Sequence, residues 1–457
     1  MHGSFGTMTL PRSAVRIEMP RNGARTETMK LTIIGGGSTY TPELFEGLVS
    51  RGAELGLTEV VLHDIDPARL DPVAGFCRRM AHAADACFQV HRTTELDAAI
   101  SGASFVVTQI RVGGQQARLR DETIPMEFGL IGQETTGAGG FAKALRTIPE
   151  ILKIAGRILE LAPDAWVINF TNPSGIITET LLRHGGVKAV GLCNIPMELR
   201  IESARAIGVD PSRVELDYIG LNHFGWVRAI RMDGTDITGM LLEALGSGIV
   251  PANIPELDYG PRFFKALGMI PSPYLQYFYQ TRRMLDTLAA ETSRALVVMD
   301  LERQLFDIYR DERQSTKPEL LSKRGGAWYS RVAIDVIRSL QSDMPARHVV
   351  NLANRIDVDS KPIIPELPVD AVIEAPAMIS SQGVRGIPAA PLPEEIIGQI
   401  RHLKSYERLT IEAATLQSER KALMALVNNP LVADVGLAGK ILDRLIENGE
   451  IAPTDRV

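Results

Sequence analysis

The sequence predicts an α/β protein with an N-terminal Rossmann-type parallel sheet and a C-terminal α+β domain. Short apolar runs alternate with amphipathic stretches from Met29 to about Pro196, which is typical of βαβ units. The first run leads into a glycine-rich turn, Gly35-Gly36-Gly37, as a dinucleotide-binding fold requires. After Pro196 the pattern changes, so we expect a domain boundary there, with domains at residues 29–196 and 197–457.

Each element follows from its local pattern. Five apolar runs predict the strands of the first domain: Leu31–Ile34, Val60–His63, Phe105–Ile110, Trp166–Phe170 and Ala189–Cys193. In the second domain a helix at Met197–Ile207 precedes strands at Val214–Asn222 and Trp226–Asp233, and the remainder is mainly helical, with loops and short extended pieces at Pro362–Pro393. Residues 1–28 hold no apolar run of signal-peptide length, and we expect a disordered extension.

Composition narrows the classes of function. Hydrophobic residues make up 45% of the 457 residues and charged residues 23%, which are ordinary values for a globular protein. The net charge of −6 is spread along the chain and predicts neither nucleic-acid nor membrane binding. Three cysteines are too few for a disulfide framework, which indicates a reducing compartment and a cytoplasmic enzyme acting on a small molecule.

The glycine-rich turn predicts a site for NAD. It lies between a strand and a helix and comprises Gly35, Gly36, Gly37, Ser38, Thr39 and Tyr40. Its glycines permit close approach of a pyrophosphate to the helix N-terminus, although Tyr40 replaces the third fingerprint glycine. Asp64 ends the second strand, where a carboxylate can bond a ribose hydroxyl and favour NAD over NADP. Alternatively, Asp64 caps the turn at Asp66.

Polar residues also follow later strands, at the sheet edge where ligands of open α/β folds bind. Arg111 follows the third strand and is suited to an anion, with a surface ion pair as the alternative. Asn172 follows the fourth strand and suits a sugar hydroxyl, although Asn-Pro is also a common turn. Glu134 lies in the glycine-rich segment Gly132–Gly140, for which we expect a flexible loop over the cofactor or, alternatively, a purely structural loop.

Three further residues are candidates for metal binding and catalysis. Cys193 and His223 each end an apolar run, and together they suit a transition metal whose remaining coordination positions accept a substrate diol. The alternatives are a small buried hydrophobe and a structural histidine. Tyr274 begins an aromatic stripe that core packing also explains. Tyr274 can act as a base only where a nearby cation acidifies its phenol.

Taken together, these segments resemble glycoside hydrolase family 4, the NAD- and metal-dependent glycosidases, and its 6-phospho-β-glucosidase branch. The motifs that carry the resemblance are Ile34–Leu44, Ile131–Gly137, Asn169–Pro173, Gly191–Pro196 and Gly220–His223. The resemblance implies a fold like that of lactate and malate dehydrogenases, and a homodimer or homotetramer. It also implies that Cys193 and His223 bind Mn²⁺ or a similar ion such as Co²⁺, Ni²⁺ or Fe²⁺.

The same resemblance implies the roles of the other residues. Tyr274 removes the proton at carbon 2 of the sugar after NAD⁺ has oxidised carbon 3, and elimination of the aglycone followed by addition of water regenerates NAD. Four residues contact the sugar or its 6-phosphate: Arg111, Asn172, Asn194 and Arg294. Members specific for α-linkages carry aspartate where this chain has Asn194, so we expect β-linked substrates and assign no leaving-group acid.

Two competing interpretations remain at the level of sequence. An NAD-dependent 2-hydroxyacid dehydrogenase would need no metal site at Cys193 and would accumulate NADH. A nucleotide-binding sensor without catalysis is disfavoured because Tyr274, Cys193 and His223 are all present.

Overall fold

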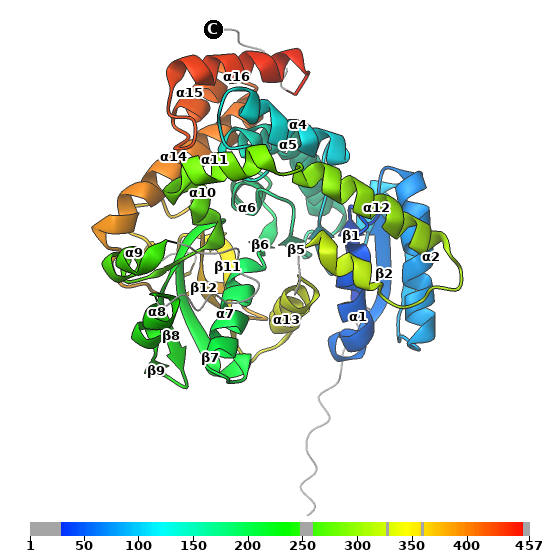
Figure 1. Cartoon of the computed structure of the whole chain (residues 1–457). Coiled ribbons are helices and arrows are strands. Elements are labelled where there is room, and N and C mark those ends of the chain that lie inside the picture. Colours follow the sequence, from blue (N-terminus) through cyan, green and yellow to red (C-terminus); the bar gives the residue numbers. More distant parts are fainter. Residues whose placement is uncertain (1–28, 247–258, 326–328, 358–360, 451–457) are drawn as a thin grey trace, which may run out of the picture.

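The computed structural model describes residues 29–246, 259–325, 329–357 and 361–450. Its strands form one mixed sheet in the order β10-β8-β7-β12-β11-β6-β5-β4-β1-β2-β3, with helices packed on both faces (Figure 1). The first six strands are parallel and follow the Rossmann order 3-2-1-4-5-6. The predicted fold class, a parallel Rossmann sheet followed by a mixed α+β part, is therefore confirmed.

The elements have the following bounds. The strands are β1 Met29–Ile34, β2 Leu57–His63, β3 Gln89–Thr93, β4 Phe105–Thr108, β5 Trp166–Asn169, β6 Lys188–Gly191, β7 Val214–Leu221, β8 Phe224–Met232, β9 Thr235–Asp236, β10 Ile270–Pro271, β11 Ala346–Ala353, β12 Val372–Ser380 and β13 Gly383–Gly386. The α-helices are α1 Thr41–Leu55, α2 Pro67–Ala83, α3 Leu96–Ile100, α4 Gly114–Glu127, α5 Gly137–Leu161, α6 Ser174–Arg183, α7 Ile195–Ala206, α8 Thr238–Gly246, α9 Gly260–Leu267, α10 Gln276–Tyr279, α11 Thr281–Ala290, α12 Arg294–Arg310, α13 Tyr329–Gln341, α14 Glu394–Leu416, α15 Glu419–Val427 and α16 Val435–Glu447. Short 3₁₀ helices lie at Pro211–Arg213, Pro273–Leu275 and Glu319–Arg324.

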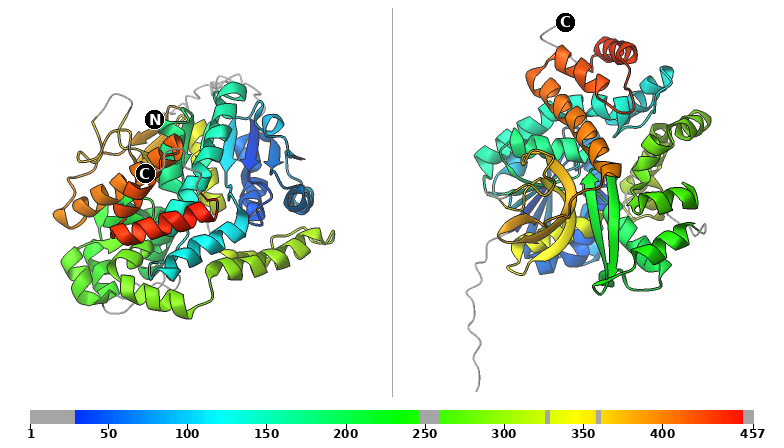
Figure 2. Two further views of the ribbon diagram at one scale, coloured as in Figure 1. Left: turned by 90° about the horizontal axis from the view of Figure 1, so that it is seen from above. Right: turned by 90° about the vertical axis from the view of Figure 1, so that its left-hand side faces the viewer.

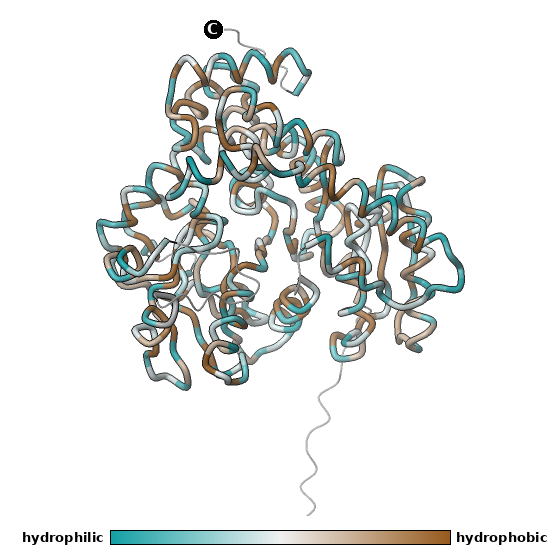
Figure 3. The backbone as a smooth tube through the Cα atoms, in the orientation of Figure 1, coloured by the Kyte–Doolittle hydropathy of each residue, from teal (hydrophilic) through white to brown (hydrophobic). Residues whose placement is uncertain are grey.

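The central parallel strands are buried on both faces. All four residues of β4 are buried, and β1 is buried except at Lys30. Helices cover both sides of these strands, which explains why their sequences read as continuous apolar runs without alternation. Figure 3 shows the same division, with hydrophobic colour along the inner strands and hydrophilic colour on the outer helix surfaces.

The C-terminal half extends the same sheet with antiparallel strands. β11 pairs with β6 at Asn351 and Gly191, and β12 pairs with β7 at Glu374 and Gly220. The sheet therefore runs across the predicted boundary near Pro196 without a break, and the division into two domains remains a prediction. Helix α12 packs against α2 and α4, and α13 packs against α1. Helices of the C-terminal half therefore also contact the Rossmann half (Figure 2).

The sequence located most elements and missed three of the longer strands, β3, β11 and β12, as well as the short strands β9, β10 and β13. All five predicted Rossmann strands are present with small shifts at their ends, and α7 and the strands β7 and β8 lie where expected. β3 was missed because it is a polar edge strand. β11 was missed because its region was taken as mainly helical, and β12 was missed because Pro362–Pro393 was taken as loops and short extended pieces, since Glu374 and Pro376 lie in the interior of this strand. Pro376 is tolerated because it lies beyond Glu374, the residue of β12 that is paired with β7.

No helix in the described part of the chain is both long and apolar enough to cross a lipid bilayer. The predictions for residues 1–28 lie outside the described residues.

A buried ionic cluster fixes α14 to α6. Lys404 Nζ donates to Glu179 Oε2 over 3.0 Å and also pairs with Glu407, and all three side chains are almost fully buried. The backbone N–H of Val372, at the start of β12, donates to the same Glu179 oxygen. One carboxylate therefore ties two helices and a central strand together.

We predict that Lys404→Met destabilises the protein by roughly 3–5 kcal/mol, because it leaves two buried carboxylates without their shared cation. The matched control is Lys421→Met, which removes a partly exposed pair with Glu412 and should cost less than about 1 kcal/mol. Urea unfolding followed by circular dichroism measures both. Equal losses in the two variants would contradict the role of the buried cluster.

Candidate active site

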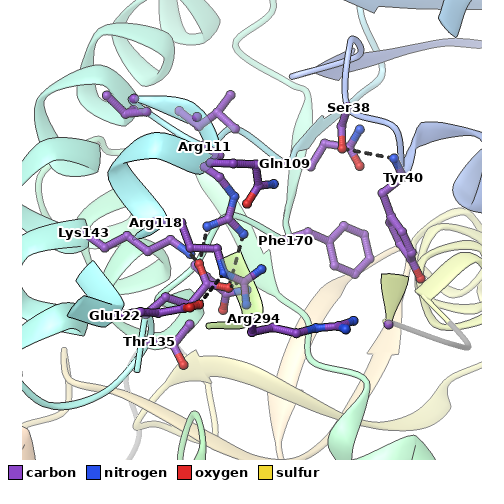
Figure 4. A pocket seen from close by; sticks show the side chains of 18 of the residues that line it. Ser38, Tyr40, Gln109, Arg111, Arg118, Glu122, Thr135, Lys143, Phe170 and Arg294 are labelled. Atoms are coloured by element: carbon purple, nitrogen blue, oxygen red, sulfur yellow. Dashed lines mark hydrogen bonds and ion pairs between the residues drawn. The ribbon is translucent and has the colours of Figure 1, made fainter. Parts of the chain in front are cut away.

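A cavity of about 1780 Å³ opens at the carboxyl edge of the parallel strands. Its wall combines the glycine turn after β1, the segments after β2, β4 and β5, and the start of α12 (Figure 4). Ten of the predicted site residues line it: Gly35, Ser38, Tyr40, Asp64, Arg111, Glu134, Asn172, Asn194, Tyr274 and Arg294. Gly37, Thr39, Cys193 and His223 are buried and are not among the residues that line it.

The glycine turn is held by its neighbours in a form that only small residues allow. Gly35 has a φ of 89°, and a Cβ there would lie 2.9 Å from the Gln109 carbonyl. The Asp64 carboxylate accepts hydrogen bonds from the N–H groups of Gly37 (2.9 Å) and Asp66 (3.1 Å). The structural role weighed for Asp64 is thus present, and its contact with a ribose remains a prediction.

Thr39 links this turn to the C-terminal half. Its hydroxyl donates to Glu302 Oε1 over 3.2 Å and accepts from Arg324 Nε over 2.9 Å. Arg324 also pairs with Glu302 and lies over the Tyr40 ring at 5.5 Å. Glu302 and Arg324, which the sequence had not assigned to the site, therefore brace the predicted cofactor turn from a distant part of the chain.

A second group of charges, with Arg111, Arg118 and Lys143, lies on the opposite wall (Figure 4), and Glu134 pairs with all three. Its carboxylate pairs with Arg111, with Lys143 at 2.6 Å and with Arg118 at 3.4 Å. Burial alone would raise the pKa of Glu134, but these three cations hold it well below its usual range. Burial and the neighbouring Arg111 lower the pKa of Lys143 to about 8. Glu134 holds these cations along the cavity, and its predicted contact with the cofactor stays a prediction.

Arg294 is differently placed from Arg111. It is the first residue of α12, its side chain projects into the cavity in Figure 4, and its Nη2 donates to the backbone oxygen of Lys323 over 2.8 Å. No salt bridge within the described ranges involves Arg294. Burial and the nearby Arg118 lower its pKa, which marks a cation that would gain from an anionic ligand.

Tyr274, which lines the cavity, contacts the buried His223, and the side chain of Asn222, the residue before His223, bonds the Cys193 thiol. His223 is in the two-residue turn between β7 and β8, with a φ of 61°, and its Nδ1 lies 3.0 Å from the Thr135 hydroxyl. The Tyr274 ring stacks on the His223 ring, with centroids 3.7 Å apart and planes 5° apart. Burial and the nearby Lys143 lower the pKa of His223 to about 3, so its imidazole is neutral at pH 7.

A thiol and an imidazole are a donor set that fits a divalent ion whose remaining coordination positions are filled by substrate. Burial and the carboxyl group of Glu374 raise the pKa of the Cys193 thiol, whereas the Asn222 amide, one residue before His223, acts in the opposite direction. A cation at this point would favour the thiolate. Within the described residues no group of three or more His, Cys, Asp or Glu side chains forms a complete metal site. A thiolate and a neutral imidazole would therefore leave positions open for substrate oxygens.

The side-chain amides of Asn172 and Asn194, both predicted to contact the sugar, make different hydrogen bonds within the protein. Asn172 lines the cavity, and its Oδ1 accepts a hydrogen bond from the Ser174 N–H over 3.3 Å, so the bond uses the oxygen of the amide and not its N–H groups. The Asn194 amide donates to Glu198, a cavity residue one turn along α7. Burial raises the pKa of Glu198 to about 7.

The structure divides the segment Gly132–Gly140. Residues 132–136 form a loop, as expected, whereas the loop prediction is wrong from Gly137 onward, where the first turn of α5 begins. A Cβ at Gly139 would lie 2.2 Å from the Asp121 backbone oxygen, so the glycine serves close packing. Lys143 on this helix was missed, although a single lysine within the apolar run Phe141–Leu145 is itself a signal of a paired, buried cation.

Comparisons with known proteins match nearly the whole chain. The models of the family 4 glycosyl hydrolases and of their C-terminal domain match residues 30–209 and 218–432. A probable 6-phospho-beta-glucosidase of Bacillus subtilis is 40% identical, and the match covers 92% of this chain and 96% of that protein.

Solved structures show the same relationship to family 4 glycosidases. The 6-phospho-beta glucosidase of Thermotoga maritima with manganese, NAD⁺ and glucose-6-phosphate superposes with a TM-score of 0.86 at 35% identity, covering 93% of this chain and 100% of that one. Malate dehydrogenase of Plasmodium falciparum, with a TM-score of 0.50, 12% identity and coverage of 85% and 99%, shares the fold alone, as expected. The chain belongs to the family 4 glycosyl hydrolases.

Proposed function

We propose that this protein hydrolyses 6-phospho-β-glucosides, using NAD and a divalent metal ion, with Mn²⁺ as the first candidate. The observation that carries the proposal is the stacking of Tyr274, which lines the same large cavity as the glycine turn, on His223, whose neighbour Asn222 bonds the Cys193 thiol. The relatives named above support the substrate class and the cofactors. Cytoplasmic location and assembly into a homodimer or homotetramer remain part of this proposal.

Each side chain has a defined task in the proposed reaction. Gly35 and the turn that follows it hold the dinucleotide, and Cys193 and His223 hold the ion. When bound, these groups supply reversible oxidation at carbon 3 and stabilisation of negative charge on the neighbouring oxygens. Tyr274 takes the proton from carbon 2, and its stacking on neutral His223 fixes the ring for that transfer.

The charged wall discriminates between phosphorylated and plain sugars. Arg111 is neutralised in large part by Glu134, whereas Arg294 donates to the backbone oxygen of Lys323 and projects into the cavity. We therefore assign the 6-phosphate to Arg294 in the first place and a sugar hydroxyl to Arg111. Asn172 contributes hydrogen bonds to the sugar, while Asn194, an amide, supports a β-linked substrate because it cannot serve as the acid.

The first prediction concerns the reaction itself. The enzyme should cleave p-nitrophenyl β-D-glucoside 6-phosphate only when NAD⁺ and Mn²⁺ are both present, with no net formation of NADH, because each turnover returns the electrons to carbon 3. Release of p-nitrophenol and absorbance of NADH are followed in parallel under reducing conditions. Accumulation of NADH in proportion to product would instead favour a 2-hydroxyacid-type dehydrogenase, and cleavage of the plain glucoside alone would remove the phosphate from the proposal.

Tyr274→Phe should lower kcat by about 10²- to 10⁴-fold, because the variant lacks the base for carbon 2. The same variant should lose exchange of the carbon 2 proton with D₂O, measured by NMR on glucose 6-phosphate with NAD⁺ and Mn²⁺. Tyr279→Phe is the matched control, since its hydroxyl accepts a hydrogen bond from Trp226 outside the cavity. Exchange at the wild-type rate in Tyr274→Phe would exclude Tyr274 as the base.

Arg294→Met should lower kcat/KM for the phosphorylated substrate by about 10- to 100-fold, the value of one charge-assisted hydrogen bond or two. Activity on the unphosphorylated glucoside should be unaffected, because that substrate has no anion for Arg294 to meet. Steady-state kinetics on the two substrates provide the measurement. A parallel loss on both would assign Arg294 to the folding of the cavity wall rather than to the phosphate.

A further inference from the structure

Four paired residues form a polar row across the centre of the sheet, where its two halves join. Gly191 of β6 is paired with Asn351 of β11, Asn351 with Glu374 of β12, and Glu374 with Gly220 of β7. Side chains of directly paired residues on neighbouring strands point to the same face of a sheet. The row therefore places one amide and one carboxyl group side by side in an apolar sheet, between two glycines.

Hydrogen bonds run along this row. Asn351 Nδ2 donates to Glu374 Oε1 over 3.1 Å and lies 3.4 Å from the Gly191 backbone oxygen. Asn222 Nδ2 donates to the same Glu374 oxygen over 3.3 Å. Asn351 and Glu374 are 0% and 1% exposed, so the cost of burying these polar groups is offset only if their bonds persist.

The two terminal glycines are required by the space around the row. A Cβ at Gly191 would lie 2.9 Å from the Asn351 Cβ and 2.1 Å from the Thr178 hydroxyl of α6. Gly220 has a φ of 152°, and a Cβ there would lie 2.3 Å from the Phe224 backbone oxygen. Larger residues at these two positions would push the neighbouring strands apart, so the glycines allow the strands to pair closely enough for the hydrogen bonds of the row to form.

The row ends at the proposed metal ligands. Cys193 comes two residues after Gly191, and His223 comes three residues after Gly220, directly after Asn222. Asn222 thus connects the two segments that carry the proposed ligands. Its side chain bonds both Glu374 and the Cys193 thiol, and the next residue in the chain is His223. Strands β11 and β12 lie between β6 and β7, the strands that lead to the two residues, so the bonds along the row hold the two segments in place relative to each other.

We propose that Glu374 and Asn351 are positioning residues that hold Cys193 and His223 at the separation that a divalent ion requires. Neither residue touches the ion. Glu374 restrains the β7–β8 turn, which carries His223, through its bond to Asn222. Asn351 restrains the segment after β6, which carries Cys193, through its bond to the Gly191 carbonyl. Groups in this outer position typically change metal affinity by 10- to 100-fold. The inference rests on the proposed function, because it takes Cys193 and His223 as the ligands.

The test measures Mn²⁺ binding to the full-length protein, saturated with NAD⁺ and glucose 6-phosphate, by the EPR signal of free Mn²⁺. Asn351→Ala should weaken the Mn²⁺ Kd by about 10- to 100-fold and broaden the spectrum of the bound ion, because the ligands are no longer held at one distance. The Kd for NAD⁺, measured separately, should stay within about twofold, since the glycine turn lies on the other side of the cavity.

A matched control separates positioning from general loss of stability. Asn354→Ala also removes a fully buried asparagine, whose amide bonds the backbone oxygens of Ile364 and Leu367 away from the row. It should lower the melting temperature while leaving the Mn²⁺ Kd unchanged. Equal weakening in both variants, or no weakening in Asn351→Ala, would overturn the positioning role.

Glu374→Gln provides a second route if Asn351→Ala does not fold. It keeps the shape of the side chain and one acceptor oxygen, so it should fold, with a smaller loss of Mn²⁺ affinity than Asn351→Ala. A wild-type Kd in this variant would count against the proposal. Cys193→Ser should abolish tight Mn²⁺ binding, and absence of Mn²⁺ binding by the wild-type protein would overturn the proposed metal site itself, and this inference with it.

Discussion

The pairing of Gly191, Asn351, Glu374 and Gly220 is the constraint on which the rest of the site depends. It joins the parallel Rossmann strands to the antiparallel strands of the C-terminal half and makes them one sheet. A shift of one residue in this register would turn every side chain to the opposite face. The bond from Asn222 to Glu374, which ties the β7–β8 turn to the centre of the sheet, would then be lost.

Electrostatics shape the cavity around this frame. Glu134 gathers three cations on one wall, and Glu302 gathers Arg69 and Arg324 near the glycine turn on the other. Each carboxylate costs free energy to bury and is stabilised by its cations. The outcome is a positively lined cavity whose arginines have fixed positions before any anion enters, so that little side-chain entropy remains to be lost on binding.

Local patterns in the sequence predicted the parallel half well, because buried parallel strands read as apolar runs and their carboxyl ends gather ligands. Those patterns led to Arg111, Asn172 and Tyr274, which line the cavity, and to Cys193 and His223, which are buried. They did not lead to β12, because Glu374 and Pro376 interrupt its apolar character, nor to Arg324, whose contact with Thr39 joins residues 285 positions apart. Such long-range pairs have no periodicity from which they can be predicted.

The hydrogen bonds of Asp64 have a consequence for the evolution of cofactor choice. An acidic residue at this strand end ordinarily excludes a 2′-phosphate, and exchange for a neutral or basic residue is the simplest route from NAD to NADP. Here the same carboxylate holds the N–H groups of Gly37 and Asp66. A substitution that admitted the phosphate would also release the glycine turn and the N-terminus of α2. The preference for NAD and the order of the glycine turn therefore depend on the same side chain. A change of preference from NAD to NADP would require at least one compensating substitution elsewhere in the turn.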